Sequence, residues 1–104
     1  MNRTIPFLER FNEPLLNGKK TWTSRPRKMA EVGDTFTVLT GTFQVDEVFK
    51  MALGDVTTSH WQQEGCLNMA DFLTVWNHIH PLKGFVDSQL VWVHVFHKLE
   101  ATQV

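Results

Sequence analysis

The strongest structural signal in this sequence is Leu90-Val-Trp-Val-His-Val-Phe-His-Lys-Leu99, close to the C-terminal end of the 104-residue chain. β-Branched and aromatic residues dominate it, and apolar side chains occur in both alternating sets of positions. Successive side chains of a strand point to opposite faces, so a strand that is apolar on both sides lies inside a sheet or in a barrel wall. Residues 90–99 therefore predict a central strand.

Three other β-rich runs precede this strand. Residues 35–39 and 42–51 flank Thr40-Gly41, a turn-forming pair, and predict a hairpin. Residues 21–25 are also rich in β-favouring types, and Pro26 ends them. Together the runs predict an α+β fold in which strands dominate and form a small closed or nearly closed sheet.

Two or three short helices fill the remaining segments. Apolar residues at roughly helical spacing predict a short, broken helix at 7–17, and a capped helix is expected at 57–64, ended by Gly65. A longer helix is predicted at 69–80, ended by Pro81. Its buried stripe is expected to be Phe72, Leu73, Trp76 and Ile79.

Length and composition restrict the class of protein. A chain of 104 residues with 42% apolar residues, eight Phe and four Trp predicts one globular domain over residues 1–104. The single cysteine, Cys66, cannot form an intrachain disulfide, and this fits a reducing compartment such as the cytoplasm. Neither a signal-peptide core nor an apolar run of about 20 residues occurs, so we expect no membrane partner.

Positive charge is concentrated near the start of the chain. Residues 1–28 carry seven Lys or Arg against two Glu, whereas residues 29–104 carry three against nine acidic residues. Five of the ten basic side chains lie within 19–28. Such a window fits an anionic or nucleotide ligand, and a solvated basic loop is the alternative.

Histidine and cysteine spacing argues against a metal site. His78 and His80 are two residues apart on a predicted helix, and His94 and His97 face opposite sides of a predicted strand. A site taking one His from each pair stays open, but no Cys or paired carboxylate supports it. Cys66 is interpreted as a buried thiol rather than a nucleophile. No dinucleotide, P-loop or hydrolase-elbow motif occurs, so we expect neither metal nor cofactor.

The segment Gly18-Lys-Lys-Thr-Trp-Thr-Ser-Arg25 concentrates reactive side chains. A threonine becomes a nucleophile when a neighbour takes its proton, and a lysine whose pKa is lowered by burial or by a second cation can do so. Lys20 has cationic neighbours of this kind. A carboxylate is still needed to orient the amine or to carry a proton to the leaving group. Glu64 is the candidate, with a solvated glutamate at a helix end as the alternative.

The motif Gly18-x-Lys20-Thr21-x-Thr23-x-Arg25, with Gly33-Asp34 before the predicted hairpin, resembles the ASCH domain family over nearly the whole chain. That family has a PUA-like β-barrel fold. Its small single-domain members include amidohydrolases that remove the acetyl group from N4-acetylcytidine and related N4-acylated cytosines, and other members are RNA-binding modules or ribonucleases.

The resemblance implies a role for each motif residue. Lys20 is the expected base and Thr23 the nucleophile, while Glu64, placed by the spacing His60-x-x-x-Glu64, is the expected proton carrier. Arg25 and Trp22 are the expected substrate-binding residues. The expected partner is a small modified nucleoside, with RNA binding or cleavage as the alternative, and the expected state is a monomer or weak dimer.

Two features of the chain depart from the pattern of these amidohydrolases, and the spacing of Lys20 and Thr23 sets a geometric condition on a shared site. Trp22 is bulky for its place in the motif, and the run Arg25-Pro-Arg-Lys28 is not a feature that we associate with these amidohydrolases. In a regular strand Lys20 and Thr23 point to opposite faces, so a shared site requires Lys20 to lie in the loop after Gly18 or across a bulge. The four tryptophans Trp22, Trp61, Trp76 and Trp92 are candidates to stack on a pyrimidine.

Overall fold

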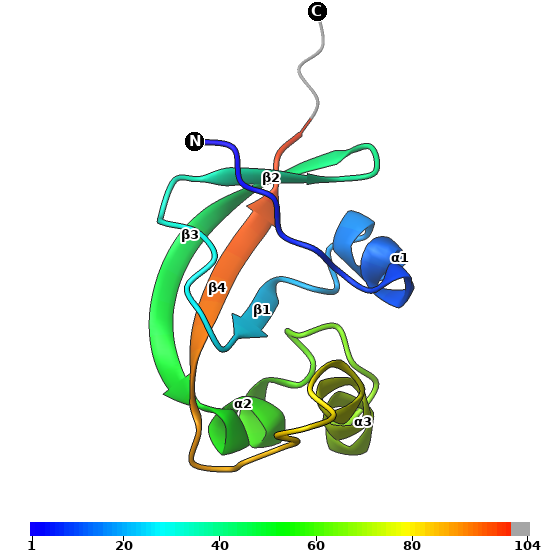
Figure 1. The fold of residues 1–104 in the computed structure, drawn as a ribbon. Helices are drawn as coiled ribbons and strands as arrows, with labels where there is room; N and C mark the ends of the chain where they lie inside the picture. The colour runs from blue at the N-terminus through cyan, green and yellow to red at the C-terminus, as the bar shows by residue number, and fades with distance from the viewer. Residues whose placement is uncertain (101–104) are drawn as a thin grey trace, which may run out of the picture.

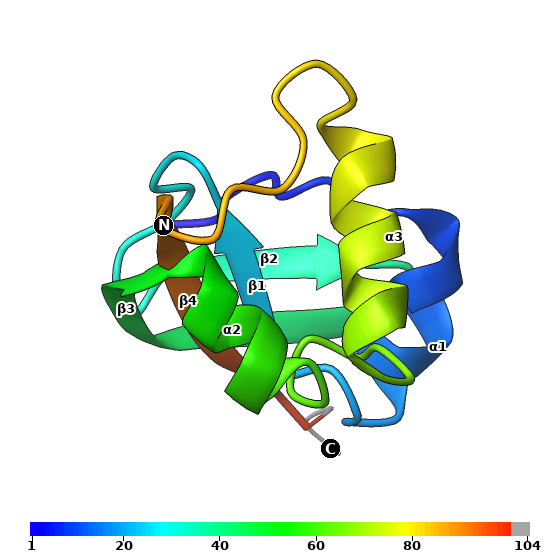
Figure 2. The same ribbon diagram turned by 90° about the horizontal axis from the view of Figure 1, so that it is seen from below.

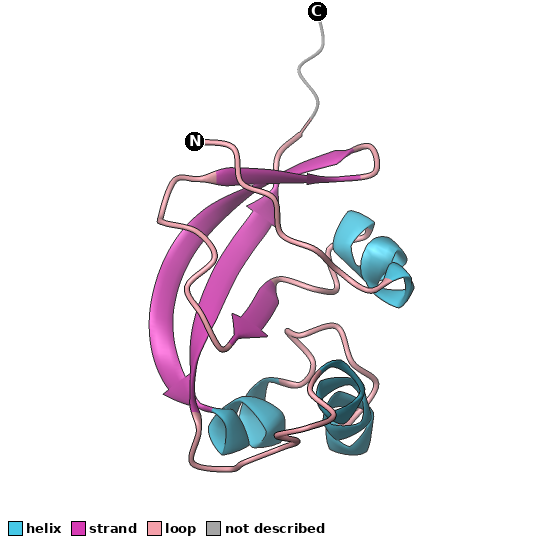
Figure 3. Ribbon diagram, in the orientation of Figure 1, coloured by secondary structure: helices cyan, strands magenta, loops and turns pink. Residues whose placement is uncertain are grey.

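The structure is a computed structural model that describes residues 1–100. Figures 1 and 3 show a curved sheet with the helices gathered beside it. In chain order the elements are η1 (Glu9–Phe11), α1 (Asn12–Leu16), β1 (Trp22–Arg25), β2 (Thr35–Val38), β3 (Gly41–Ala52), α2 (Leu53–His60), α3 (Met69–Ile79) and β4 (Leu90–Lys98).

The sheet is antiparallel throughout, in the order β1-β4-β3-β2. The prediction that residues 90–99 form a central strand is confirmed, because β4 pairs with β1 on one side and β3 on the other. A bulge between Val45 and Glu47 shifts the register of β3 against β4, and bulges increase local twist. The sheet curls into a half-barrel in which β1 and β2 are the edge strands, so the α+β prediction is confirmed and the barrel is open.

The core lies inside the curl of the sheet. Three fully buried aromatic rings lie at its centre: Phe36 contacts Phe43 and Phe96, with ring centroids 5.2 and 5.1 Å away. Val91 and Val93 of β4 are also fully buried. The hairpin of β2 and β3 therefore packs onto the central strand through aromatic contacts.

Helices η1, α1 and α3 lie together on one side of the sheet, near β1 (Figures 1 and 2). The Arg10 guanidinium links η1 to α3 by donating to both Asp71 carboxylate oxygens, at 3.0 and 2.7 Å. Helix α3 begins after Asn68, whose side chain accepts from the Asp71 N–H. Phe72 and Trp76 are buried as predicted, whereas Leu73 is only half-buried and Ile79, in the last turn, is 48% exposed, so the predicted burial of Ile79 is wrong.

The predicted helix at 57–64 is displaced along the chain. Helix α2 occupies Leu53–His60 and follows β3 directly, so it begins and ends four residues before the predicted bounds. The N–H groups of Leu53 and Gly54 donate to the carbonyls of Gln89 and Asp87, at 2.7 and 2.9 Å. These tertiary hydrogen bonds satisfy N–H groups of the first turn of α2, as a side-chain cap would. Sequence patterns carry no signal for them.

The remaining boundaries differ little from the predictions. The expected helix at 7–17 is a 3₁₀ turn, η1, followed directly by α1, so the break takes the form of a change of helix type at residues 11–12. Residue 8 is extended and precedes the helix, which therefore begins two residues later than predicted. Within residues 1–100, the helices are too short and too polar for any of them to cross a bilayer.

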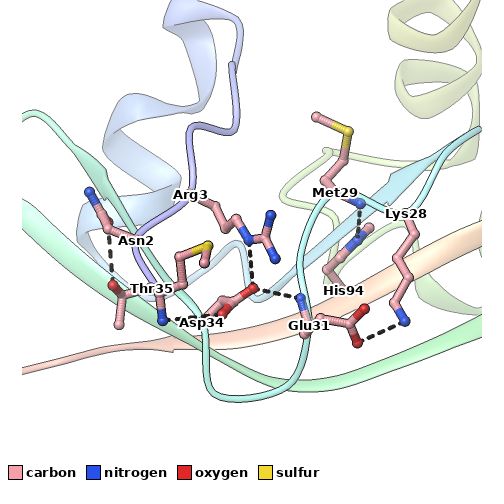
Figure 4. A network of polar contacts seen from close by, with 9 residues as sticks. Asn2, Arg3, Lys28, Met29, Glu31, Asp34, Thr35 and His94 are labelled. Carbon is pink, nitrogen blue, oxygen red and sulfur yellow. Dashed lines mark hydrogen bonds and ion pairs between the residues drawn. The ribbon is translucent and has the colours of Figure 1, made fainter.

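Asp34, just before β2, ties the N-terminus to the sheet (Figure 4). Its carboxylate accepts from the Glu31 N–H at 2.9 Å and from Arg3 Nε at 2.7 Å, and it lies 3.3 Å from the terminal amine of Met1. These contacts lower the pKa of Asp34 from 3.8 to about 2, with the Glu31 N–H as the largest cause. A carboxylate held in this way stabilises the fold only while it is ionised.

We predict that Asp34 makes the free energy of unfolding depend on pH in the acid range. Its contribution is complete above pH 3.8 and is lost as the pH falls towards about 2, because protonation removes the hydrogen-bonded anion. Asp34→Asn should be less stable than wild type at pH 5 and should lose less on transfer to pH 3, measured as urea unfolding midpoints. Equal losses in the two proteins would contradict the assignment.

Candidate functional site

A cavity of about 500 Å³ lies between β1 and the helices. The segment before η1, the end of β1 with the loop that follows it, the turn at 64–66 and helix α3 form its walls. Aromatic side chains supply much of the lining, from Phe7, Phe11, Phe72 and Trp76. The size falls within the range of about 300–1,000 Å³ that is usual for small-molecule sites. Lys20, Thr23, Glu64 and Arg25 all line this cavity, so the structure brings together four of the five predicted site residues.

Lys20 lies in the loop between α1 and β1 rather than in the strand. Its N–H donates to the Pro14 carbonyl at 2.9 Å, and Gly18, with a φ of +84°, turns the chain from the helix into this loop. Strand β1 begins two residues later, at Trp22. The condition for Lys20 and Thr23 to share a site is therefore met.

The Lys20 amine and the Glu64 carboxylate form a buried ion pair. Lys20 Nζ donates to the Glu64 carbonyl oxygen at 2.6 Å and lies 3.3 Å from Glu64 Oε1. Each residue is only 4% exposed. The amine also lies 4.6 Å from the centre of the Phe11 ring, a cation–π distance. The interpretation of Glu64 as a solvated helix-end residue is thus wrong.

Backbone hydrogen bonds hold Glu64 beside Lys20. The Gln63 carbonyl accepts from the N–H groups of both Thr21 and Trp22, at 2.8 and 3.0 Å. Gly65 then turns the chain away with a φ of +83°, and a Cβ atom at this position would lie 2.8 Å from Lys20 Cβ. The turn at 63–65 is therefore packed directly onto the loop that carries Lys20.

Burial of the Lys20 amine lowers its pKa below the ordinary value of 10.5, and the negative charge of Glu64 opposes this effect. Desolvation has the larger influence because the charged amine has left water and gains only one carboxylate. A lowered pKa increases the fraction of Lys20 that is neutral near physiological pH. Lys20 thus meets the chemical requirement for a base.

Arg25 orients the Thr23 hydroxyl. Its Nε–H donates to Thr23 Oγ1 at 3.0 Å, while Nη2 donates to the Pro6 carbonyl at 2.6 Å. Because Thr23 Oγ1 accepts this bond, its own proton is left for another acceptor. Thr23 is 3% exposed and lines the cavity, so the hydroxyl is fixed in a site shielded from bulk water.

Ser24 is a site residue that the sequence interpretation did not single out. Ser24 Oγ donates to Glu64 Oε2 at 2.6 Å, in a buried position. Consecutive strand residues normally face opposite sides, yet both Thr23 and Ser24 line the cavity. β1 is an edge strand, so the cavity can reach around it. The only signal in the sequence was the run of hydroxyls within the motif.

Trp22, the fifth predicted site residue, lies outside the cavity wall. Its ring stacks on His60, with centroids 4.2 Å apart, and meets Phe49 edge-on. Alternation puts Trp22 on the same side of β1 as Ser24, but the contacts with His60 and Phe49 hold its ring away from the cavity. Among the tryptophans of residues 1–100, Trp76 alone is part of the cavity wall.

His94 has a structural role beneath the site. Its Nε2 accepts from the Met29 N–H at 3.0 Å (Figure 4), which leaves Nδ1 to donate to the Thr23 carbonyl at 3.2 Å. Burial lowers the pKa of this fully buried ring, in keeping with a neutral imidazole. Nowhere in residues 1–100 do three or more His, Cys, Asp or Glu side chains gather as metal ligands do.

Comparison with known proteins identifies the fold. No protein-family model and no curated protein sequence matches the chain. Its structure resembles an ASCH domain from Lactobacillus crispatus JV V101, at 15% identity and a TM-score of 0.68, over 93% of this chain and 77% of that one. The fold is that of an ASCH domain.

Two other solved structures are similar to this chain. One is protein EF3133 from Enterococcus faecalis V583, of family DUF984, at 17% identity and a TM-score of 0.65, covering 86% of this chain and 67% of that one. The other is the hypothetical protein PH0355, at 14% identity and a TM-score of 0.69, covering 95% and 100%. At these identities the comparisons establish the architecture, so activity has to be argued from the site.

The packing of Gly65 against Lys20 in this ASCH fold yields a stability prediction. Gly65→Ala combines left-handed backbone strain with a close contact to Lys20 Cβ and should destabilise the protein. Gly33→Ala is the matched control, because Gly33 has a φ of +91° and open space around it. We expect Gly65→Ala to lose about 1–3 kcal/mol more than Gly33→Ala in urea unfolding. Equal losses would show that the turn at 63–65 is not packed as described.

Cys66 lines the cavity as a buried thiol, as predicted. Burial raises the pKa of Cys66 to about 11, although the nearby Lys20 opposes the shift. At pH 8 we expect iodoacetamide to alkylate the native protein at least about 100-fold more slowly than a cysteine peptide, since little thiolate is present. Unfolding in urea should restore the peptide rate. Rapid alkylation of the native protein would contradict this prediction and make Cys66 a candidate nucleophile.

Proposed function

We propose that this protein is an amidohydrolase that removes an acetyl or related acyl group from the N4 amine of an acylated cytosine nucleoside. The observation that carries the proposal is that Lys20, Thr23 and Glu64 line one largely apolar cavity, with Lys20 and Glu64 in direct contact. The resemblance of Gly18-x-Lys20-Thr21-x-Thr23-x-Arg25 to the motif of such enzymes supports the same roles.

In the first half of the reaction, Thr23 Oγ1 attacks the acyl carbonyl carbon and its proton passes to the neutral Lys20 amine. The tetrahedral intermediate then breaks its bond to N4. The departing amine takes a proton from the Lys20 ammonium through Glu64, whose Oε1 lies 3.3 Å from Nζ. The products of this half are the free cytosine amine and an ester on Thr23.

In the second half, water attacks the Thr23 ester. Lys20 accepts a proton from the water, and the Thr23 oxygen takes a proton back as the carboxylic acid leaves. Arg25 supports both halves, because its Nε–H donates to the same Thr23 oxygen, at an Nε–Oγ1 distance of 3.0 Å in the free protein. The net reaction consumes one water and yields cytidine and acetate.

The shape of the cavity suits a planar base. Phe7, Phe11, Phe72 and Trp76 supply aromatic walls, and a pyrimidine gains both buried apolar area and ring contacts from such walls. Lys20 and Glu64 lie among them at low exposure, so the reacting amide would be held away from bulk water. A water-poor site also strengthens the electrostatic interactions on which the proton transfers depend.

The direct test is cytidine release from N4-acetylcytidine, followed by chromatography. We expect Thr23→Ala to lower kcat/KM at least about 10³-fold and Lys20→Ala by about 10²–10⁴-fold. Thr21→Ala is the matched control, because Thr21 belongs to the same motif but does not line the cavity, and it should retain activity. Full activity in folded Thr23→Ala would refute the nucleophile assignment, and the same result in Glu64→Ala would refute only the role of Glu64.

The pH dependence provides a second readout of the same triad. If Lys20 is the base, kcat/KM rises with pH to a midpoint below 10.5, because the neutral amine is the active form. The charge of Glu64 raises the pKa of Lys20, so Glu64→Gln should move the midpoint of its residual activity to lower pH. A midpoint that stays in place would contradict this electrostatic coupling.

A second function, RNA binding, is favoured by a different observation. Lys28 and Lys50 place their amines 5.3 and 4.9 Å from the centre of the half-buried Trp92 ring. A partly exposed aromatic ring beside two cations is typical of surfaces that hold single-stranded nucleic acid. Salt-sensitive RNA binding that is weakened by Trp92→Ala, without acyl release, would favour this function over the amidohydrolase.

A further inference from the structure

The mouth of the cavity carries positive charge without carboxylate partners. Arg25 and Arg27 both line the cavity, and neither forms an ion pair within residues 1–100. The three lysines of the basic window 19–28 are either paired or outside the cavity. Lys20 pairs with Glu64 and Lys28 with Glu31, while Lys19 does not line the cavity. The unpaired guanidinium groups are therefore concentrated at this opening.

The charged side chains that line the cavity carry a net positive charge. Among its lining residues within 1–100, Lys20, Arg25 and Arg27 face a single carboxylate, that of Glu64. An excess remains even when the Lys20 amine is neutral. Arg25 is half-buried, and desolvation lowers the pKa of its guanidinium, which means that the charge lacks full compensation. A neutral nucleoside would leave this excess in place, whereas an anionic ligand would remove it.

Arg25 has hydrogen-bonding capacity left for such a ligand. Its Nε and Nη2 are occupied by Thr23 Oγ1 and the Pro6 carbonyl, while Nη1 makes no hydrogen bond within residues 1–100. Arg27 is exposed, and its side chain donates to no partner in the same part of the chain. His80 lies at the same opening, where its ring packs on Trp76 with centroids 4.3 Å apart.

The position of the reacting amide decides where the rest of the substrate lies. Lys20 and Glu64 are 4% exposed and mark the deep end, whereas Arg27 is exposed and marks the mouth. In a cytosine ring N4 and N1 are at opposite ends. If the acylated N4 reaches Lys20 and Glu64, the sugar on N1 points towards Arg27.

We propose that the substrate is an N4-acylated cytidine 5′-monophosphate, whose phosphate binds Arg27 and Nη1 of Arg25 at the mouth of the cavity. This inference rests on the proposed amidohydrolase function and adds the class of substrate to it. A phosphate monoester carries about −1.5 to −2 charges at pH 7, enough to offset a net wall charge of +2 with Lys20 charged or +1 with Lys20 neutral. Guanidinium groups bind phosphate oxygens through paired N–H donors, so two arginines suit this group better than a neutral hydroxyl.

The test compares three substrates: N4-acetylcytidine, its 5′-monophosphate, and an RNA oligonucleotide that contains one N4-acetylcytidine. We expect kcat/KM to be at least about tenfold higher for the monophosphate than for the nucleoside, mainly through a lower KM. In Arg27→Ala this advantage should fall to less than about threefold. Lys19→Ala, which removes an exposed cation of the same basic window outside the cavity, should keep the full advantage.

A direct binding measurement separates this inference from the proposed function. Titration calorimetry with cytidine 5′-monophosphate and with cytidine needs no turnover. If neither substrate is hydrolysed but the monophosphate binds at least about tenfold more tightly in an Arg27-dependent way, the phosphate site stands and the amidohydrolase falls. Equal kcat/KM and equal affinity for the two ligands, or equal loss for both in Arg27→Ala, would overturn the phosphate site. Preference for the oligonucleotide over the monophosphate would overturn the mononucleotide assignment.

Discussion

The buried ion pair of Lys20 and Glu64 is the constraint around which the site is organised. Taking both charges out of water is costly, and the attraction between them compensates only when the remaining hydrogen-bonding capacity is satisfied. Here the Glu64 carbonyl and the Ser24 hydroxyl supply those bonds, at 2.6 Å each. The pair also joins the loop before β1 to the turn after α2, so the geometry of the site and local stability depend on the same contacts.

The open edge of the half-barrel explains why the cavity forms where it does. β1 is a four-residue edge strand that, within residues 1–100, pairs with β4 alone, and the helices beside it leave space over its free edge. Both Thr23 and Ser24 reach this space, one bound to Arg25 and the other to Glu64. An ASCH-like fold thus offers a strand edge at which two adjacent hydroxyls can serve one site, although the fold alone does not specify a reaction.

Charge divides the cavity into two regions with different chemistry. At the deep end one cation and one carboxylate are coupled closely enough to move a proton, in surroundings that lower the pKa of the amine. At the mouth Arg27 is exposed and Arg25 has a free N–H group, which suits recognition rather than proton transfer. Arg25 belongs to both regions, because it contacts Thr23 with one nitrogen and has another available for a ligand.

Local patterns were enough to predict the α+β class, the central strand at 90–99, the hairpin and the helix near 69–80, because each depends on short-range periodicity. The motif at 18–25 concentrates unusual side-chain chemistry and indicated Lys20, Thr23 and Arg25, while the resemblance to the ASCH family, with the spacing His60-x-x-x-Glu64, indicated Glu64. Tertiary structure decided the start of α2, the role of Ser24 and the exclusion of Trp22 from the cavity. Each of these depends on contacts between segments distant in sequence, such as Leu53 with Gln89 and Ser24 with Glu64, and hydrophobic periodicity carries no information about such contacts.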